Sequence, residues 1–215
     1  MAKFILGEKI GMTRIYDAKG KAIPVTVIQA GPVYVTQIQK KEDKISVQVG
    51  YGYNKHINKP EKGHLAKTGI DKSLKELKEY HETTENADKI QVGDEINVSI
   101  FEEGDIIDVM GVSKGKGFAG TIKRHHFTRG PKTHGSHNYR QPGSIGSAYP
   151  QRVFKGVRMA GHMGHTQITV KKLKVMEVHP SEKLLIVSGA IPGARGTLVV
   201  IKEATSKVNS KQTKG

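Results

Sequence analysis

The stretch VSKGKGFAGTIKRHH, residues 112–126, places glycines beside positive charges at a spacing that could bind a phosphate. Gly115, Gly117 and Gly120 form a G-x-G-x-x-G pattern after an apolar run, as in the phosphate-binding turn of dinucleotide-binding proteins. Such a turn requires an acidic residue about 20 positions later to hold the ribose hydroxyl, and that position falls near Arg140. The missing acidic residue disfavours a nucleotide-dependent enzyme. We keep this enzyme as an alternative hypothesis for the function of the protein.

Histidines offer a second candidate chemistry. His134 with His137, and His162 with His165, form two H-x-x-H pairs that could in principle hold zinc. Structural zinc sites depend mainly on cysteine, and the chain contains no cysteine. No carboxylate lies close in sequence to orient the rings or to support acid–base catalysis. We therefore expect no metal, no cofactor, no small-molecule substrate and no catalytic residue.

The missing carboxylates are the strongest signal in the sequence. The chain of 215 residues has a net charge of +15, and the segment from Val109 to Met176 holds 13 Lys and Arg, 6 His, 11 Gly and no Asp or Glu. The rest of the chain is nearly balanced, with 22 basic and 20 acidic residues. Exposed surfaces normally mix both signs, because unpaired like charges repel one another. This segment therefore predicts a polyanionic partner.

Arginine favours nucleic acid as that partner. Its planar guanidinium binds phosphate through two parallel hydrogen bonds and stacks on bases. Glycines among the cations would let the backbone approach another surface closely. Neither a recognition helix nor a zinc finger is visible, which favours folded RNA over sequence-specific binding to DNA. A third alternative is a cationic protein that binds anionic surfaces, including membranes, without specificity. Five of the seven arginines lie within residues 113–165: Arg124, Arg129, Arg140, Arg152 and Arg158.

Aromatic residues are interleaved with these cations, and they could stack on bases or pack against the fold. For each aromatic residue taken alone, packing is the first interpretation. The five residues are Phe118, Phe127, Tyr139, Tyr149 and Phe154.

The elements that position this segment are predicted to be short strands. Runs of β-branched and alternating residues, separated by glycine and proline turns, are typical of an antiparallel barrel or sandwich. We predict a mainly β protein: a closed antiparallel β-barrel with a long irregular extension and one or two short helices. The predicted strands are Lys3–Leu6, Ile23–Ala30, Val33–Gln39, Ile45–Tyr51, Ile96–Ile100, Ile106–Val112, Thr166–Val178, Leu184–Ser188 and Thr197–Lys202.

Two segments that interrupt the pattern of predicted strands define the expected domains. Residues 1–112 and 166–205 together should form the barrel, with a polar, partly helical insertion at 54–91. Within that insertion a helix is predicted over Asp71–His81, because Leu74, Leu77 and Tyr80 would fall on neighbouring turns. Residues 113–165 form the basic extension, which lacks apolar periodicity, and residues 206–215 a disordered basic tail. The longest uncharged run, Ala22–Gln39, is broken by prolines, so no membrane span is expected.

Five stretches are distinctive in combination: GEKIGMTRI at 7–15, IPVTVI at 23–28, SKGKGFAGTIKRH at 113–125, HGSHNYRQPGSIG at 134–146 and RVFKGVRMAGHMG at 152–164. Together they resemble the bacterial large-subunit ribosomal protein L three family. The resemblance implies a translation-factor-like barrel bound to large-subunit (23S) ribosomal RNA near its 3′ end. It also implies early subunit assembly, neighbouring large-subunit proteins as partners, a cytoplasmic location in the ribosome, and an extension running toward the peptidyl-transferase centre.

Composition and resemblance together select the expected site. The expected RNA-binding residues are Lys114, Lys116, Lys123, Arg124, His125, Arg129, Lys132, His134, His137, Arg140, Arg152, Lys155, Arg158, His162 and His165. By the resemblance, the inward tip consists of Gln141, Pro142, Gly143, Ser144, Ile145, Gly146, Ser147, Ala148 and Tyr149. Many bacterial members carry a methylated Gln shortly after the SIG motif, where this chain has Ser147-Ala148-Tyr149. Gln151 is the nearest Gln, and the modification is not carried over.

Overall fold

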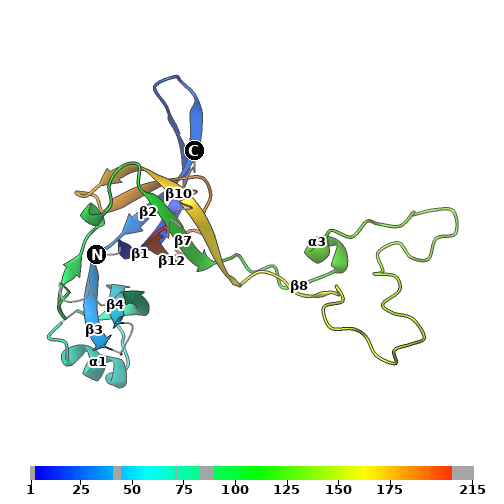
Figure 1. Cartoon of the computed structure of the whole chain (residues 1–215), viewed down its shortest axis with the longest axis horizontal. Coiled ribbons are helices and arrows are strands. Elements are labelled where there is room, and N and C mark those ends of the chain that lie inside the picture. The colour runs from blue at the N-terminus through cyan, green and yellow to red at the C-terminus, as the bar shows by residue number, and fades with distance from the viewer. Residues whose placement is uncertain (1–2, 41–44, 71, 83–89, 205–215) are drawn as a thin grey trace, which may run out of the picture. The chain divides into compact units, whose positions relative to one another are not determined.

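The computed structural model describes residues 3–40, 45–70, 72–82 and 90–204. It divides the chain into two compact units (Figure 1). The first unit contains the residues before Ser113 and after Thr166, and the second unit is Ser113–Thr166. The basic tail predicted at 206–215 lies outside the described residues.

Six antiparallel strands of the first unit pair in a ring. Each strand is hydrogen-bonded to two neighbours in the order β1-β12-β7-β10-β11-β2, and β2 pairs with β1 again, so the ring leaves no free edge. Buried residues alternate with more exposed ones in β11 and β12, as the period of two of a strand requires. The strands are β1 (Phe4–Tyr16), β2 (Ala22–Ala30), β7 (Ile106–Val112), β10 (Gln167–His179), β11 (Leu184–Ser188) and β12 (Leu198–Glu203).

A second sheet completes the first unit, in the order β5-β4-β3-β6. Its strands are β3 (Val33–Lys40), β4 (Ile45–Tyr53), β5 (Leu74–Glu82) and β6 (Glu95–Ile96). The expectation that all strands outside the extension close one barrel is therefore wrong for these four. They share one hydrophobic core with the ring, and the rings of Phe4 and Tyr80 stack at 4.1 Å between centroids. Burial against a neighbouring sheet satisfies their apolar faces as well as closure would.

The helix predicted over Asp71–His81 is wrong, because Leu74–Glu82 is strand β5, paired with β4 from Tyr53↔Leu74 to Ile45↔Glu82. Leu74 and Tyr80 are six residues apart, so they share one face of a strand, and both are buried. The helix prediction rests on the three-residue steps through Leu77, and the pairing with β4 decides against it. The helix of this region is α1 (Lys59–Ala66), where the Glu61 carboxylate accepts the N–H of Asn58 at 3.2 Å.

Two other predictions need correction. The strand expected over Ile96–Ile100 is only two residues long, and a 3₁₀ turn, η1 (Val98–Ile100), follows it. Strand β1 continues ten residues beyond Leu6 and forms a hairpin with β2. The mainly β class with short helices is confirmed. No helix in the described part of the chain is long and apolar enough to cross a membrane.

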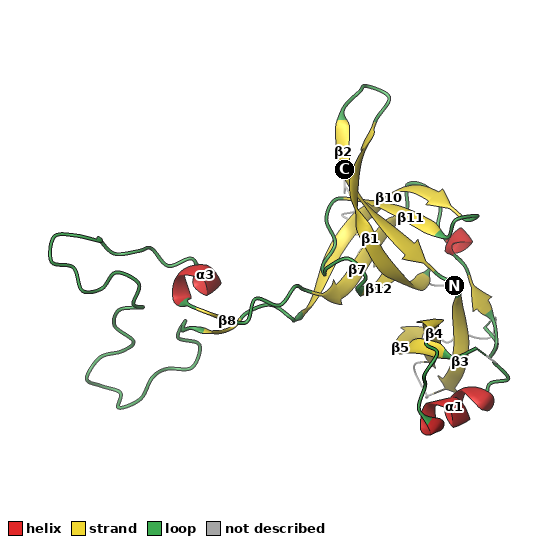
Figure 2. Cartoon of the chain, turned by 180° about the vertical axis from the view of Figure 1, so that it is seen from behind, coloured by secondary structure: helices red, strands yellow, loops and turns green. Residues whose placement is uncertain are grey.

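The second unit contains little regular structure. Strands β8 (Phe118–Ala119) and β9 (Gly161–His162) form a two-stranded ladder, and α3 (Thr121–His125) follows β8. Figure 2 shows that loops make up most of the remainder.

Candidate nucleic-acid interface

The two ends of the second unit are joined by backbone hydrogen bonds, which we call the root ladder (residues 113–119 and 161–166). The ladder continues into the β8–β9 pair, where Phe118 lies opposite His162 and Ala119 opposite Gly161. Its other bonds run from Ser113 N to Thr166 O (2.9 Å), Lys116 N to Met163 O (2.9 Å), Met163 N to Gly117 O (3.0 Å) and His165 N to Ser113 O (3.2 Å). The backbone therefore fixes the entry and exit of the unit.

Glycine is required at one position of the root ladder. Gly164 has a φ of +75°, and a Cβ on it would lie 2.1 Å from the carbonyl oxygen of Lys114. No side chain fits there unless the backbone moves, so the two segments of the root ladder can approach this closely only because residue 164 is glycine.

The G-x-G-x-x-G stretch does not form a dinucleotide-binding turn. Gly115 and Gly117 lie in the antiparallel root ladder, and Gly120 precedes a helix of only five residues. A dinucleotide site requires a parallel βαβ unit with a full helix after the turn. The nucleotide-dependent alternative therefore lacks its structural context.

Helix α3 holds the returning chain at the root ladder. The Arg124 guanidinium donates to the carbonyl oxygen of Met159 at 2.8 Å, and the His125 ring lies 3.0 Å from the same oxygen. A Cβ on Gly161 would lie 2.6 Å from Arg124 Nη1, so the guanidinium packs directly on that glycine. Arg124 and His125, both predicted to bind RNA, thus also stabilise the unit itself.

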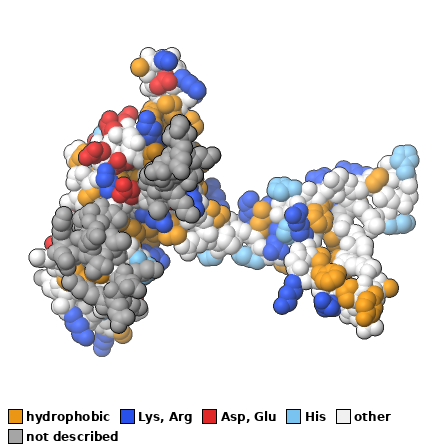
Figure 3. Space-filling view, in the orientation of Figure 1, with side chains coloured by type: hydrophobic (Ala, Val, Ile, Leu, Met, Phe, Trp, Pro, Cys, Tyr) orange, Lys and Arg blue, Asp and Glu red, His pale blue; other side chains and the backbone are white. Residues whose placement is uncertain are grey.

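The remaining predicted RNA-binding residues are exposed. Figure 3 shows Lys, Arg and His side chains over this unit with no acidic side chain among them, in agreement with the sequence. The Lys and Arg side chains among them are cations available to an anionic partner. The exposed residues are Lys114, Lys116, Lys123, Arg129, Lys132, His134, His137, Arg140, Arg152, Lys155, Arg158, His162 and His165, whereas Arg124 and His125 are half-buried.

Three cations converge on Tyr139. The loop that carries it is closed by a hydrogen bond from Gly130 N to Tyr139 O at 3.1 Å, and the Lys132 ammonium lies 5.5 Å from the centre of the Tyr139 ring. The hydrogen bond with Lys132, opposed by burial, acts with Arg129 and the charge of Arg140 to hold the pKa of the Tyr139 phenol below its ordinary value. This loop therefore concentrates positive charge around an aromatic ring.

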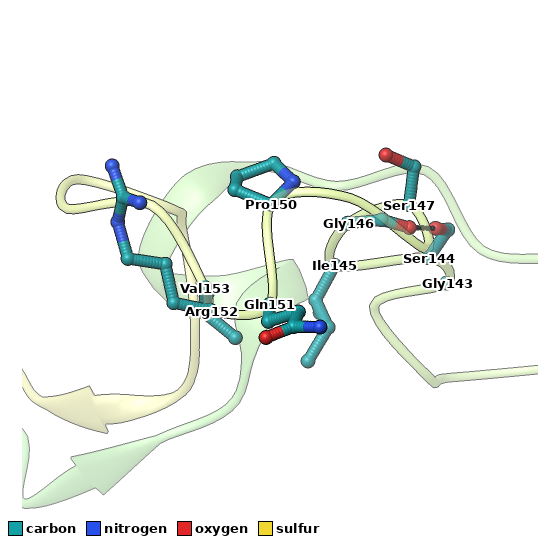
Figure 4. A pocket seen from close by; sticks show the side chains of 9 residues that line it. All are labelled: Gly143, Ser144, Ile145, Gly146, Ser147, Pro150, Gln151, Arg152 and Val153. Carbon is teal, nitrogen blue, oxygen red and sulfur yellow. Dashed lines mark hydrogen bonds between the residues drawn. The ribbon is translucent and has the colours of Figure 1, made fainter.

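The predicted tip is open to solvent. Every residue from Gln141 to Tyr149 is exposed, and Tyr149 is 82% exposed. Local hydrogen bonds shape it: Ser144 Oγ donates to Gly146 O at 2.9 Å and Ser147 Oγ to Tyr149 O at 2.6 Å. A shallow hollow lies here, lined by residues 143–147 and 150–153 (Figure 4). The tip offers small side chains and backbone groups to a partner, with Arg152 at its edge.

The aromatic residues divide into two groups. Phe118, Tyr149 and Phe154 are 81%, 82% and 53% exposed, so the packing interpretation is wrong for these three. Phe127 and Tyr139 are half-buried. Phe118 was not among the predicted site residues, although its setting between glycines in an acid-free stretch, G-F-A-G, could have indicated an exposed ring.

The two H-x-x-H pairs lie on separate parts of the unit. His162 and His165 lie on the root ladder, and His134 and His137 lie in the loop of residues 130–139 that carries Tyr139. Across the described ranges, no three His, Cys, Asp or Glu side chains come together as a group that could hold a metal ion.

Comparison with known proteins gives the family. A sequence model described as Ribosomal protein L3 matches residues 15–184. The large ribosomal subunit protein uL3 of Synechococcus sp. (strain JA-3-3Ab) is 46% identical over 98% of this chain and 100% of its own length. Proteins of the same name from Carboxydothermus hydrogenoformans and Finegoldia magna are 48% and 47% identical, over 95% and 94% of this chain and 98% of their own lengths. The chain therefore belongs to the ribosomal protein L3 family.

Proposed function

We propose that this protein is a structural constituent of the large ribosomal subunit and binds 23S ribosomal RNA through residues 113–165. The observation that carries this proposal is an acid-free unit with ten exposed or half-exposed Lys and Arg side chains, in a chain whose relatives are named large ribosomal subunit proteins. Neighbouring large-subunit proteins are the other expected partners, and the role is structural.

The charge of the second unit supports a partner with many phosphates. Because no carboxylate within the unit neutralises the cations, an external polyanion would relieve their mutual repulsion. Ten basic side chains could contact about six to ten phosphates, each contact releasing counterions from the RNA. The exposed backbone and glycines of the loops suit close approach to a folded RNA surface.

The finer parts of the proposal follow the family resemblance. The ring of six strands would be the translation-factor-like barrel. Residues 1–112 and 166–205 would form the domain that lies near the 3′ end of the RNA. The protein would join the subunit early in assembly. The uncharged tip, Gln141–Tyr149, would lie toward the peptidyl-transferase centre, and its small residues would pack against RNA that is already in place.

The cations near the root ladder and the tip should therefore have separable roles. Lys116 and Lys123 are exposed cations near the root ladder, where each contact would position the rest of the unit. Ser144 and Ser147 carry no charge and sit in the tip. Loss of the cations should reduce binding, whereas changes in the tip should alter the chemistry of the subunit that holds it.

The test compares ribosome occupancy with peptide-bond formation. Lys116→Glu/Lys123→Glu is expected to abolish sedimentation with large subunits, while Ser144→Ala and Ser147→Ala keep occupancy and change the rate of peptidyl transfer. Arg124 is left intact, because its replacement would also break the contact with Met159. Lys19→Glu/Lys62→Glu, two exposed lysines of the first unit, is the matched control for net charge. Retained occupancy of the Lys116/Lys123 variant with loss in the tip variants would contradict the proposal.

A further inference from the structure

The β8–β9 ladder has two faces with different surroundings. Successive residues of a strand point to opposite faces, and residues directly opposite one another in an antiparallel pair point to the same face. The register Phe118↔His162 and Ala119↔Gly161 therefore places Phe118 and His162 on one face. Ala119 and Gly161 lie on the other.

The Ala119–Gly161 face is covered by the protein itself. Ala119 is 4% exposed, and the Arg124 guanidinium lies against Gly161 while donating to Met159 O at 2.8 Å. Helix α3 thus packs on this face and fixes the ladder against rotation. The orientation of the opposite face is set by the same contacts.

The Phe118–His162 face is open. Phe118 is 81% exposed, the highest exposed fraction of any described phenylalanine, and His162 is exposed as well. Burying a phenylalanine side chain is worth about 1.5–3 kcal/mol, so a ring held in water by an ordered ladder loses that stabilisation. A single exposed ring does not by itself mark a site. Here the exposed ring is held on an ordered ladder within an acid-free, cationic unit, and this combination points to an occupant from another molecule.

Charge and backbone shape restrict the occupant. The unit around this face carries ten Lys and Arg and no carboxylate, so the occupant is anionic. Lys114 and Lys116 are exposed on the limb that leads into β8. A Cβ added at Gly117 or Gly120, on either side of Phe118 and Ala119, would meet nothing within 4 Å, so the backbone there is open to close approach. A nucleotide within an RNA strand is anionic and also presents a flat aromatic surface, so it meets both requirements.

We propose that Phe118 and His162 form a stacking platform for an unpaired base of RNA. Side chains directly opposite in an antiparallel pair have Cβ atoms about 4.5–5.5 Å apart, so both rings lie on one face within reach of the same base. Base–aromatic stacking tolerates any base, because every base has a flat π face. The inference rests on the proposed binding of RNA and adds the residues that contact a base rather than phosphates.

The test uses the absence of tryptophan from the chain. Phe118→Trp introduces a single indole at the platform, and Tyr53→Trp places one at a position that is 73% exposed in the first unit. The probes are a single-stranded oligoadenylate of about twelve nucleotides and an RNA duplex of the same length. Stacking predicts that the oligoadenylate quenches the fluorescence of Phe118→Trp, that the duplex does so much less, and that Tyr53→Trp responds to neither.

Affinity for the oligoadenylate gives the second readout. Phe118→Ala and Phe118→Leu should each raise Kd by about 5- to 150-fold, while Phe118→Trp keeps the wild-type Kd. Wild-type affinity in Phe118→Leu, or equal quenching by oligoadenylate and duplex, would overturn the platform while leaving the proposed RNA binding intact. Failure of the wild-type chain to bind either RNA would overturn both.

Discussion

The two units of this chain use their side chains in opposite ways. In the strand ring the side chains specify the fold: Leu185, Val187, Val199 and Ile201 are fully buried, and the paired strands leave no free edge. In the second unit backbone bonds and glycines fix the path, and most side chains remain exposed. The comparison shows a segment whose path is set by backbone contacts and glycines, which leaves its side chains available to a partner.

The cations of the two units show the same contrast. In the first unit Lys9 is buried, and its ammonium donates to the carbonyl oxygens of Ile191 at 2.8 Å and Gly193 at 3.1 Å. Lys3 pairs with Asp105 at 2.6 Å. The second unit contains no carboxylate with which its Lys and Arg side chains could pair. Lys3 and Lys9 thus stabilise the first unit, whereas most Lys and Arg side chains of the second unit, Arg124 aside, are exposed.

The largest expected difference between the units concerns stability. Leu185→Ala removes a fully buried side chain from the ring and should lower the free energy of unfolding by about 2–5 kcal/mol. Ile145→Ala, at a residue that is 43% exposed in the tip, should change it by less than about 0.5 kcal/mol. Urea denaturation followed by circular dichroism measures both. A loss of similar size in the two variants would show that the tip belongs to the cooperative core.

A smaller effect is expected from the Lys3–Asp105 pair. The hydrogen bond to Asp105, opposed by burial, raises the pKa of Lys3. Burial would raise the pKa of the Asp105 carboxyl, but the N–H of Glu102 and the Lys3 ammonium hold it below its ordinary value of 3.8. Asp105→Asn should cost about 0.2–1 kcal/mol at neutral pH, as is usual for a pair near the surface.

The sign of the pH dependence follows from these directions. A carboxyl group whose pKa is lower in the folded than in the unfolded protein stabilises the fold. This stabilisation is complete at pH values above the pKa of the unfolded state and is lost as the pH falls through the pKa of the folded state. The wild-type advantage over Asp105→Asn should therefore be present at pH 7 and shrink below about pH 4. Urea titrations at several pH values measure it, with Glu182→Gln at an exposed carboxylate as control. An advantage that persists unchanged in acid would exclude the ionised pair as its source.

The sequence predicts the ring well because its strands carry their own signal. Runs such as Ile106–Val112 and Leu184–Ser188 are β-branched, bounded by turns, and match β7 and β11. The end of β1 escaped prediction, because Gly7, Gly11 and the charged residues around them break the alternation, and only pairing with β2 extends the strand. Strand β5 was missed because the three-residue steps from Leu74 to Leu77 to Tyr80 fit a helix, whereas in the strand only Leu74 and Tyr80, which are six residues apart, share the buried face.

The candidate site can be predicted from the sequence by residue type, but its geometry cannot. The acid-free composition identifies the cations of 113–165 without any structure. It gives no indication that Arg124 is held by Met159, or that Gly164 is needed for the contact with Lys114, because both depend on residues more than thirty positions away. The open ring of Phe118 likewise depends on the register with His162.

The central claim is that the second unit carries the RNA affinity and the first unit folds without it. A variant in which residues 114–164 are replaced by a short Gly-Ser linker tests this most directly, because β7 and β10 already pair up to Val112↔Gln167 and the linker only needs to close their ends. Its folding is checked by a cooperative thermal transition.

The decisive measurement is the salt dependence of affinity for deproteinised large-subunit ribosomal RNA. By analogy with duplex DNA, contacts to about six to ten phosphates predict that the affinity of the full chain falls by roughly 10³–10⁵-fold between about 50 and 200 mM salt. The folded linker variant should bind far more weakly, with only a shallow dependence on salt. A linker variant that keeps the affinity and the steep salt dependence of the full chain would contradict the account.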